Sequence, residues 1–217
     1  MLWDILFALL LFGSVDIFLH FVFYVLHVTH HIPNDSKARW FAIHSIGNIF
    51  TVYTILPELW IAASTPDQLY VRPCTFKGYY VVLSLHLYHF LAFKVNSNDI
   101  FHHILFVLLL GGYCNLFQPY IASSIPLLTL NGIPGAIDYM LLAGVRLELV
   151  PKLTEKRINA FLNTWIRMPL TCFFGGVAYV YVNQYGKWEC IPCILGIMYN
   201  AVYYGNMAII NYQSYIQ

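Results

Sequence analysis

The chain has 217 residues, of which 59% are hydrophobic and only 10% are charged. Soluble domains carry about 25% charged residues, so a soluble fold is excluded because it could not bury this much apolar surface. The net charge of +1 indicates no class of partner, and no basic patch argues for nucleic-acid binding, so we expect no nucleic-acid partner. We predict an all-α polytopic membrane protein, one domain over residues 1–217, because its apolar runs are long enough for transmembrane helices.

Seven apolar stretches predict a bundle of about seven membrane-spanning helices. They are Trp3–His27, Trp40–Ala63, Gly78–Phe93, Ile100–Phe117, Pro119–Val145, Ile158–Gln184 and Trp188–Ile210. The first lacks a basic leading segment and a cleavage site, so we expect a retained span and not a signal peptide. The fifth is broken by Asn131-Gly-Ile-Pro-Gly and is either one bent crossing or a re-entrant pair. Both alternatives place Asp138 inside the protein. The sixth is interrupted near Arg167.

Lysines and arginines in the loops predict the orientation of the chain. If all seven stretches cross, seven basic residues fall on one side and three on the other. Cytosolic loops carry the excess of Lys and Arg, so we expect the first side in the cytosol and the N-terminus outside. The first set is Lys37, Arg39, Lys94, Arg146, Lys152, Lys156 and Arg157, and the second is Arg72, Lys77 and Lys187. The count favours a single crossing by the fifth stretch, because a re-entrant pair would invert the C-terminal half.

All nine histidines precede residue 104. In the predicted topology eight of them lie at the cytosolic ends of the first four helices, and only His20 lies deeper. Ionisable residues inside a membrane are costly, and they mark functional sites or water-filled cavities. We therefore predict a polar cavity that binds a substrate at the cytosolic leaflet. Its predicted substrate-binding residues are His44, His86, His89, Asp138 and Tyr203. For His44, a hydrogen-bonded core histidine is the alternative.

His102 and His103 follow a short polar hairpin and open the fourth helix. Adjacent helical residues diverge by about 100°, so one imidazole can face the cavity while the other faces a neighbouring helix. Asp99 lies one turn before His103, where a carboxylate can orient the imidazole and raise its basicity. This is the arrangement of a general base. The predicted catalytic residues are therefore His102, His103 and Asp99.

Metal binding is the alternative use of the histidines, because imidazole is the commonest metal ligand near neutral pH. His27-Val-Thr-His30-His31 and His86-Leu-Tyr-His89 resemble the histidine boxes of membrane di-iron hydroxylases and desaturases, which would use iron. Those families carry three boxes, and here only His102-His103 stands at the third position. The predicted ligands in this alternative are His27, His30, His31, His86, His89, His102 and His103. Otherwise His30 and His31 are polar tips at the lipid headgroups.

Two motifs resemble the TLC-domain family, which includes the ceramide synthases. Arg39-Trp-Phe-Ala-Ile-His44 opens one span, and Asp99-Ile-Phe-His102-His103 opens another. The resemblance implies a helical bundle around a lipid-accessible cavity, and acyl transfer from acyl-CoA at His102, His103 and Asp99. The ceramide synthases have more residues between the aspartate and the histidine pair. They also have a second Asp-rich motif, for which this chain offers only Asp138.

The favoured function is lipid metabolism or lipid binding in the endoplasmic reticulum or another internal membrane, with membrane lipids as partners. The alternative, which the minimal loops also fit, is a structural membrane subunit of a larger complex with no activity of its own. Cys190 and Cys193 form a Cys-x-x-Cys pair at the outer end of the last helix. We expect a structural disulfide or two unrelated thiols there, because no thioredoxin-like context surrounds them.

Overall fold

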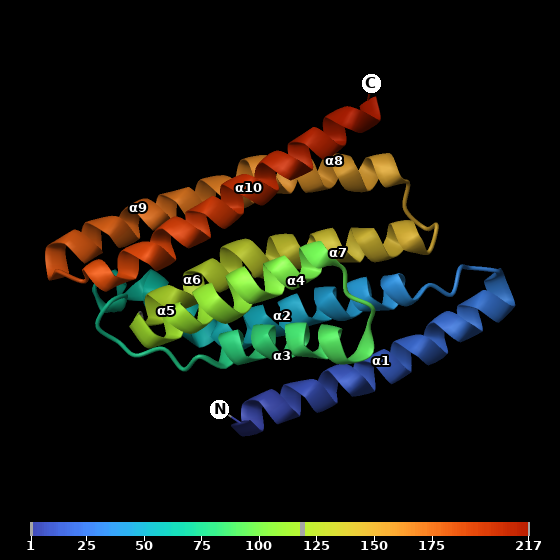
Figure 1. Cartoon of the computed structure of the whole chain (residues 1–217), viewed down its shortest axis with the longest axis horizontal. Helices are drawn as coiled ribbons and strands as arrows, with labels where there is room; N and C mark the ends of the chain where they lie inside the picture. The colour runs from blue at the N-terminus through green and yellow to red at the C-terminus, as the bar shows by residue number, and fades with distance from the viewer. Residues whose placement is uncertain (1, 118–119, 217) are drawn as a thin grey trace.

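The computed structural model describes residues 2–117 and 120–216, and every regular element in these ranges is helical (Figure 1). Six helical rods in these ranges are long and apolar enough to cross a membrane, as in an integral multi-pass membrane protein. They are α1 (Leu2–His30), α2 (Ser36–Ser64) and the composite rods Ser97–Phe117, Ile121–Arg146, Lys152–Tyr185 and Trp188–Ile216. The shorter α3 (Lys77–Ala92) packs against α1 and α2 as a seventh rod. A short helical turn, η1 (Pro66–Gln68), lies between α2 and α3.

The predicted fifth stretch is one rod that runs in a single direction. It comprises η3 (Ile121–Ser123), α6 (Ser124–Pro126), η4 (Leu127–Gly132) and α7 (Ile133–Arg146). Pro134 stands in the first turn of α7, where a missing N–H leaves no hydrogen bond unmade. The chain therefore stays helical through Asn131-Gly-Ile-Pro-Gly and does not reverse there, as a single crossing requires. Pro119, the first residue of the predicted stretch, lies outside the described residues.

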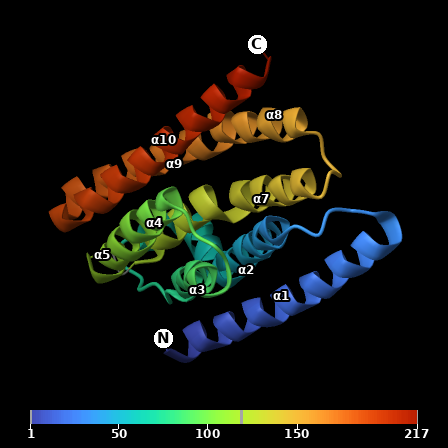
Figure 2. The ribbon, with the colours of Figure 1, turned by 45° about the vertical axis from the view of Figure 1, so that its right-hand side comes forward.

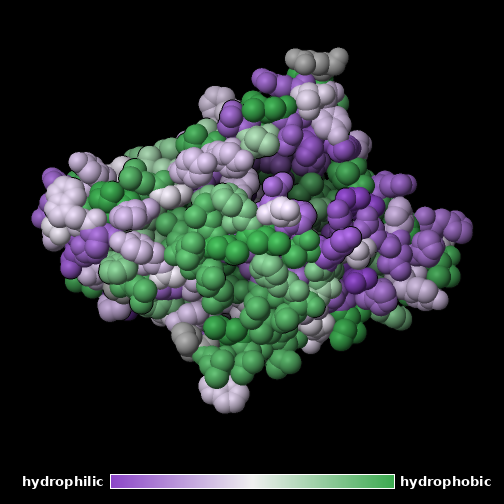
Figure 3. All heavy atoms as spheres, viewed as in Figure 1, coloured by the Kyte–Doolittle hydropathy of each residue, from purple (hydrophilic) through white to green (hydrophobic). Residues whose placement is uncertain are grey.

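Consecutive rods alternate in direction, so their connections gather at two ends of the molecule (Figures 1 and 2). Residues 31–35, 93–96 and 147–151 connect rods at the right-hand end of Figure 1. Hydrophilic side chains gather toward that end, whereas apolar side chains cover the middle of the same face (Figure 3). The rods therefore alternate in direction as the predicted orientation assumes.

Helices α2 and α7 make the most extensive contact in the bundle. Ser45 Oγ of α2 donates a hydrogen bond to the Ala136 carbonyl of α7 over 2.7 Å. At Gly135 a Cβ atom would lie 2.8 Å from Asn48 Nδ2, so only glycine allows this approach without displacing the amide. Small residues and interhelical hydrogen bonds are what packs helices in lipid. The contact fixes the position of Asn48 and His44 relative to α7.

Three composite rods contain π-helical turns, in which the backbone bonds skip one more residue than in an α-helix. They are η2 (His103–Leu110) between α4 (Ser97–His102) and α5 (Gly111–Phe117), η4, and η5 (Asn163–Arg167) between α8 (Lys152–Leu162) and α9 (Met168–Tyr185). The last rod, η6 (Trp188–Cys190) followed by α10 (Ile191–Ile216), has none among its described residues. The predicted interruption near Arg167 is thus a π-helical turn and not a break. Each of the three π segments supplies residues to one cavity.

Candidate functional site

A polar cavity of about 340 Å³ lies among α2, α3, α4, η2, η4, α7, α8, η5 and α10. Its volume is in the range of small-molecule sites, roughly 300–1,000 Å³. Five of the nine histidines line it: His44, His86, His89, His102 and His103. Seven asparagines also line it, together with Asp99, Asp138 and Arg167. Imidazoles and amides therefore dominate the wall, and they both donate and accept hydrogen bonds.

Aromatic rings hold the imidazoles in place. The ring of His89 stacks on Trp40 with 3.8 Å between centroids, and the ring of His44 stacks on Tyr139 with the same separation. His86 lies edge-on to both His44 and His103, at 5.3 and 4.7 Å. Side chains locked by packing lose little freedom when a ligand binds. The cluster is therefore preorganised.

Hydrogen bonds set which ring nitrogens are available. His86 Nδ1 lies 2.7 Å from the Val82 carbonyl, which only accepts, so this nitrogen carries the proton and Nε2 keeps its lone pair. His89 Nδ1 lies 3.4 Å from His103 Nε2, and His102 Nδ1 lies 3.2 Å from the Tyr204 hydroxyl. His102 and His103 thus each have one ring nitrogen paired with a residue of a neighbouring helix, α10 and α3 respectively.

Four buried polar atoms at this cavity have no hydrogen-bond partner in the part of the chain that the structure describes. They are His44 Nδ1, His103 Nδ1, Asp138 Oδ1 and Arg167 Nε. A buried polar group left unpaired costs about 1–3 kcal/mol. Four such atoms around one cavity indicate that a polar ligand or water completes their bonding.

The predicted pairing of Asp99 with His103 is not formed among the described residues. Asp99 Oδ2 instead accepts a hydrogen bond from the Asn96 backbone N–H over 2.9 Å, while the Asn96 side chain accepts from Asp99 N and Asn98 N. This is a capping box, which satisfies donors at the start of a helix. Asp99 lies at the cavity but caps the start of α4, and His89 lies beside His103 instead.

The structure brings the predicted His44, His86, His89, His102, His103, Asp99 and Asp138 to this one cavity. It does not bring Tyr203 there: the ring is 44% exposed and packs against Tyr199 and Tyr204. Tyr204, the next residue, lines the cavity instead. Neighbouring positions on a helix point about 100° apart, so only one of two adjacent tyrosines can face the cavity. The sequence alone did not show whether this is Tyr203 or Tyr204.

The histidines at the end of α1 are separate from the cavity. His27, His30 and His31 are exposed and are not part of its lining. His31 ends α1 in the left-handed conformation, with φ of 55°, and His27 Nδ1 donates to the Ile32 carbonyl over 2.9 Å. The seven predicted metal ligands therefore do not converge. Within residues 2–117 and 120–216, no group of three or more His, Cys, Asp or Glu is placed to hold a metal ion.

A polar ladder on α8 and η5, which the sequence analysis did not predict, lines the same cavity. Asn163 Nδ2 donates to the Asn159 carbonyl over 2.9 Å, and Arg167 Nη1 donates to Asn163 Oδ1 over 3.0 Å. These residues recur every four positions along the helical rod, a spacing that places them on one face. This four-residue spacing is the feature of the sequence that could have indicated the ladder.

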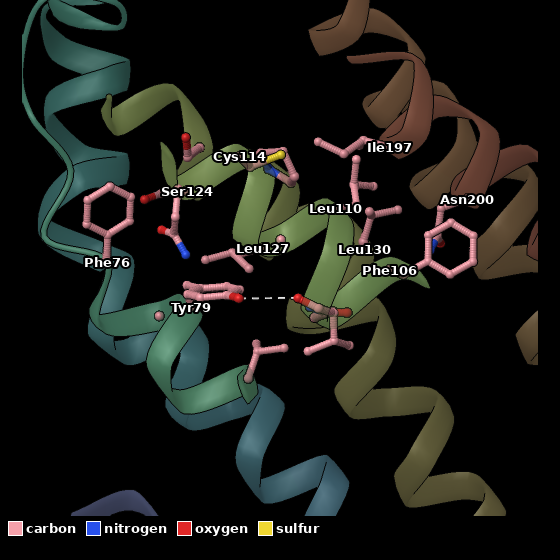
Figure 4. A pocket seen from close by; sticks show the side chains of 18 of the residues that line it. Phe76, Tyr79, Phe106, Leu110, Cys114, Ser124, Leu127, Leu130, Ile197 and Asn200 are labelled. Atoms are coloured by element: carbon pink, nitrogen blue, oxygen red, sulfur yellow. Dashed lines mark hydrogen bonds between the residues drawn. The ribbon is translucent and has the colours of Figure 1, made fainter. Parts of the chain in front are cut away.

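An apolar pocket of about 110 Å³ adjoins the polar cavity (Figure 4). His102, Leu130, Asn131 and Asn200 line both. From there the pocket runs beside η2 and α5, past Phe106 and Leu110, to Cys114 and Ser124. Tyr79 lies across it, with its hydroxyl donating to the Val107 carbonyl over 3.3 Å. The two chambers together have a polar end and an apolar end.

No family model, curated protein or solved structure matches this chain. The resemblance to the TLC-domain family therefore stays a prediction from its two short motifs. The cavity and its contacts are the basis for the functional argument below.

Proposed function

We propose that the protein is a lipid-modifying membrane protein that holds a lipid headgroup in the polar cavity and transfers an acyl group there. The observation that carries this proposal is the set of four unpaired buried atoms around one cavity. A headgroup with hydroxyl or amine groups would give each of them a partner.

His103 is the proposed general base. If its Nε2–H donates to His89 Nδ1, the lone pair on the unpaired Nδ1 is free to accept a proton. A hydroxyl or amine of the bound lipid loses its proton to this nitrogen and attacks the carbonyl carbon of an acyl thioester. The carbon–sulfur bond then breaks, and the proton passes from His103 to the departing thiolate. The resemblance to the ceramide synthases suggests acyl-CoA as the thioester.

Arg167 is the proposed stabiliser of the oxyanion that forms during this attack. Its Nε is buried and unpaired at the cavity, while Nη1 is fixed by Asn163. Preorganised donors that face a developing negative charge lower the barrier because they need no reorganisation. His89 acts as a positioning residue, because it contacts His103 and is stacked on Trp40.

The apolar pocket fits the tail of the same lipid. His102 and Cys114 both line it and are 12 positions apart, which is at most roughly 18 Å at the α-helical rise of about 1.5 Å per residue. One leaflet of the hydrocarbon core is about 15 Å deep. The pocket therefore has the reach of one acyl chain.

The test uses purified protein in nanodiscs with radiolabelled acyl-CoA and a panel of lipids that carry a free hydroxyl or amine. We expect label in a lipid product, and a loss of at least roughly 100-fold with His103→Ala, as for the removal of a general base. His30→Ala is the matched control, because this histidine is exposed at the end of α1.

Full activity in the His103→Ala variant would refute the assignment of the base. A wild-type protein that retains a lipid through purification but transfers no label to any acceptor would refute acyl transfer. That result would leave lipid binding as the function.

A further inference from the structure

The rod Ser97–Phe117 and α10 run in opposite directions and form one wall that both chambers share (Figure 1). His102 lines both chambers from this rod, and Asn200 lines both from α10. Further along, Leu110 and Ile197 line the apolar pocket from the same two rods (Figure 4). We call the line of contact between the two rods the seam. A lipid that fills both chambers therefore lies along the seam.

The seam is tied where α5 meets the start of the last rod. The Tyr113 hydroxyl donates to the Glu189 carbonyl over 3.0 Å. Cys190 forms no disulfide with Cys193, and its thiol instead donates to the Phe117 carbonyl over 3.3 Å. These two hydrogen bonds hold the end of α5 against the last rod.

The opposite end of the seam is joined by fewer contacts. His102 Nδ1 lies 3.2 Å from the Tyr204 hydroxyl, and within the described residues no other hydrogen bond links α4 or η2 to α10. Beside it, the ring of Phe106 stacks on that of Tyr199 with 6.5 Å between centroids. Beyond this bond the cavity opens between α4 and α10, because its exposed lining residues are Asn98, Met207 and Asn211.

We propose that α4 and η2 form a gate through which a membrane lipid enters both chambers sideways from the bilayer. The hinge is Gly111 and Gly112, which follow η2 and directly precede the tied Tyr113, because glycine changes its backbone conformation at little steric cost. The latch is the hydrogen bond between His102 and Tyr204. The inference rests on the proposed function, since it supplies the route by which the lipid reaches its site.

A gate along the seam spares the lipid a costly path. When α4 and η2 swing away from α10, the cavity and the pocket open together, so the headgroup and the tail enter side by side. Entry by any route through the apolar pocket would carry a polar headgroup through an apolar environment, which is unfavourable. His103 belongs to η2, so closure also returns the proposed base to its place beside His89.

The test measures lipid entry without any acyl transfer. Purified protein is placed in phosphatidylcholine vesicles, and a phosphatidylethanolamine with a photoactivatable acyl chain is then added. Mass spectrometry shows whether the chain labels Leu127 and Leu130, which line the pocket. In the Phe106→Cys/Tyr199→Cys protein a short bis-methanethiosulfonate reagent locks the gate before the lipid is added, and a reducing agent unlocks it.

We expect the locked protein to lose the label in the pocket and the reduced protein to regain it. The matched control is Tyr113→Cys/Glu189→Cys, which locks the end that is already tied and should leave labelling unchanged. Equal labelling of the locked and reduced gate, or no label in the pocket of the unlocked protein, would overturn the proposal. Gated labelling in a protein that transfers no acyl group would support the gate and refute only acyl transfer.

A single variant tests the latch independently of the cross-links. Tyr204→Phe removes the hydrogen bond to His102 and keeps the ring, so the pocket should be labelled roughly two- to tenfold faster, as for the loss of one hydrogen bond. Labelling at the wild-type rate or slower would contradict the gate, even if the double variants fail to fold.

Discussion

Gly111 lines the apolar pocket, and adding one methyl group there tests the packing around it. A Cβ at Gly111 would lie 2.6 Å from Cε2 of Tyr79, so the ring must move and its 3.3 Å hydrogen bond to the Val107 carbonyl is disturbed. Overpacking of this kind costs about 1–3 kcal/mol. Replacing glycine by alanine within a helix also gains roughly 1 kcal/mol of helix propensity. We therefore expect Gly111→Ala to lose up to about 2 kcal/mol of stability.

Gly112→Ala is the matched control, because the nearest atom to its added Cβ is the Tyr79 hydroxyl at 4.0 Å. The gain in helix propensity is common to both variants, so the difference between them isolates the overpacking cost of about 1–3 kcal/mol. The assay is thermal unfolding in nanodiscs, where this corresponds to roughly 2–12 °C between the two variants. Equal unfolding temperatures, or a higher one for Gly111→Ala, would refute the packing described around Tyr79.

Three further predictions concern topology, the polar ladder and the loop before α3. A cysteine introduced by Ser36→Cys should be labelled by a membrane-impermeant maleimide only from the cytosolic side; labelling from outside would reverse the orientation. Asn163→Leu should lower the free energy of unfolding by about 1–3 kcal/mol, measured thermally, because it leaves Arg167 Nη1 without its acceptor. Burial raises the pKa of the Cys74 thiol to about 11. Only the thiolate reacts, so the alkylation rate of Cys74 should rise about tenfold per pH unit between pH 7 and 9. Peptide-resolved mass spectrometry measures this rate, and a plateau below pH 9 would contradict the raised pKa.

Composition and hydropathy were enough to predict the class of fold. Long apolar runs predicted the helical rods, because in lipid each rod must satisfy its own backbone. Their alternation followed from the prediction that every stretch crosses the membrane. The π-helical turns were not predictable in the same way. The apolar sequence of η2 is compatible with either an α-helix or a π-helix, so contacts with other rods decide between them.

The sequence predicted which residues line the site better than it predicted the contacts that they make. Histidines near the same ends of successive helices must lie at the same membrane depth, which brought His44, His86 and His103 into one prediction. Their partners depend on side-chain directions that spacing alone does not give. Asp99 illustrates this limit, since the same carboxylate one turn before His103 can face the imidazole or cap its own helix, and it caps the helix.

The π-helical turns make the cavity depend on chain length as well as on residue type. An α-helix advances by about 100° per residue, whereas η5 accommodates its residues with a wider turn just before α9. A π-helical turn holds one residue more than an α-helical turn, so deleting one residue there would let an ordinary α-helix form while α9 keeps its orientation relative to α8. Thr171, whose hydroxyl donates to that of Thr129 in η4 over 3.1 Å, would keep its partner, whereas the residues of η5 at the cavity would change place. A single deletion in these short segments should therefore preserve the packing of the rods and alter the cavity, even though no loop is involved.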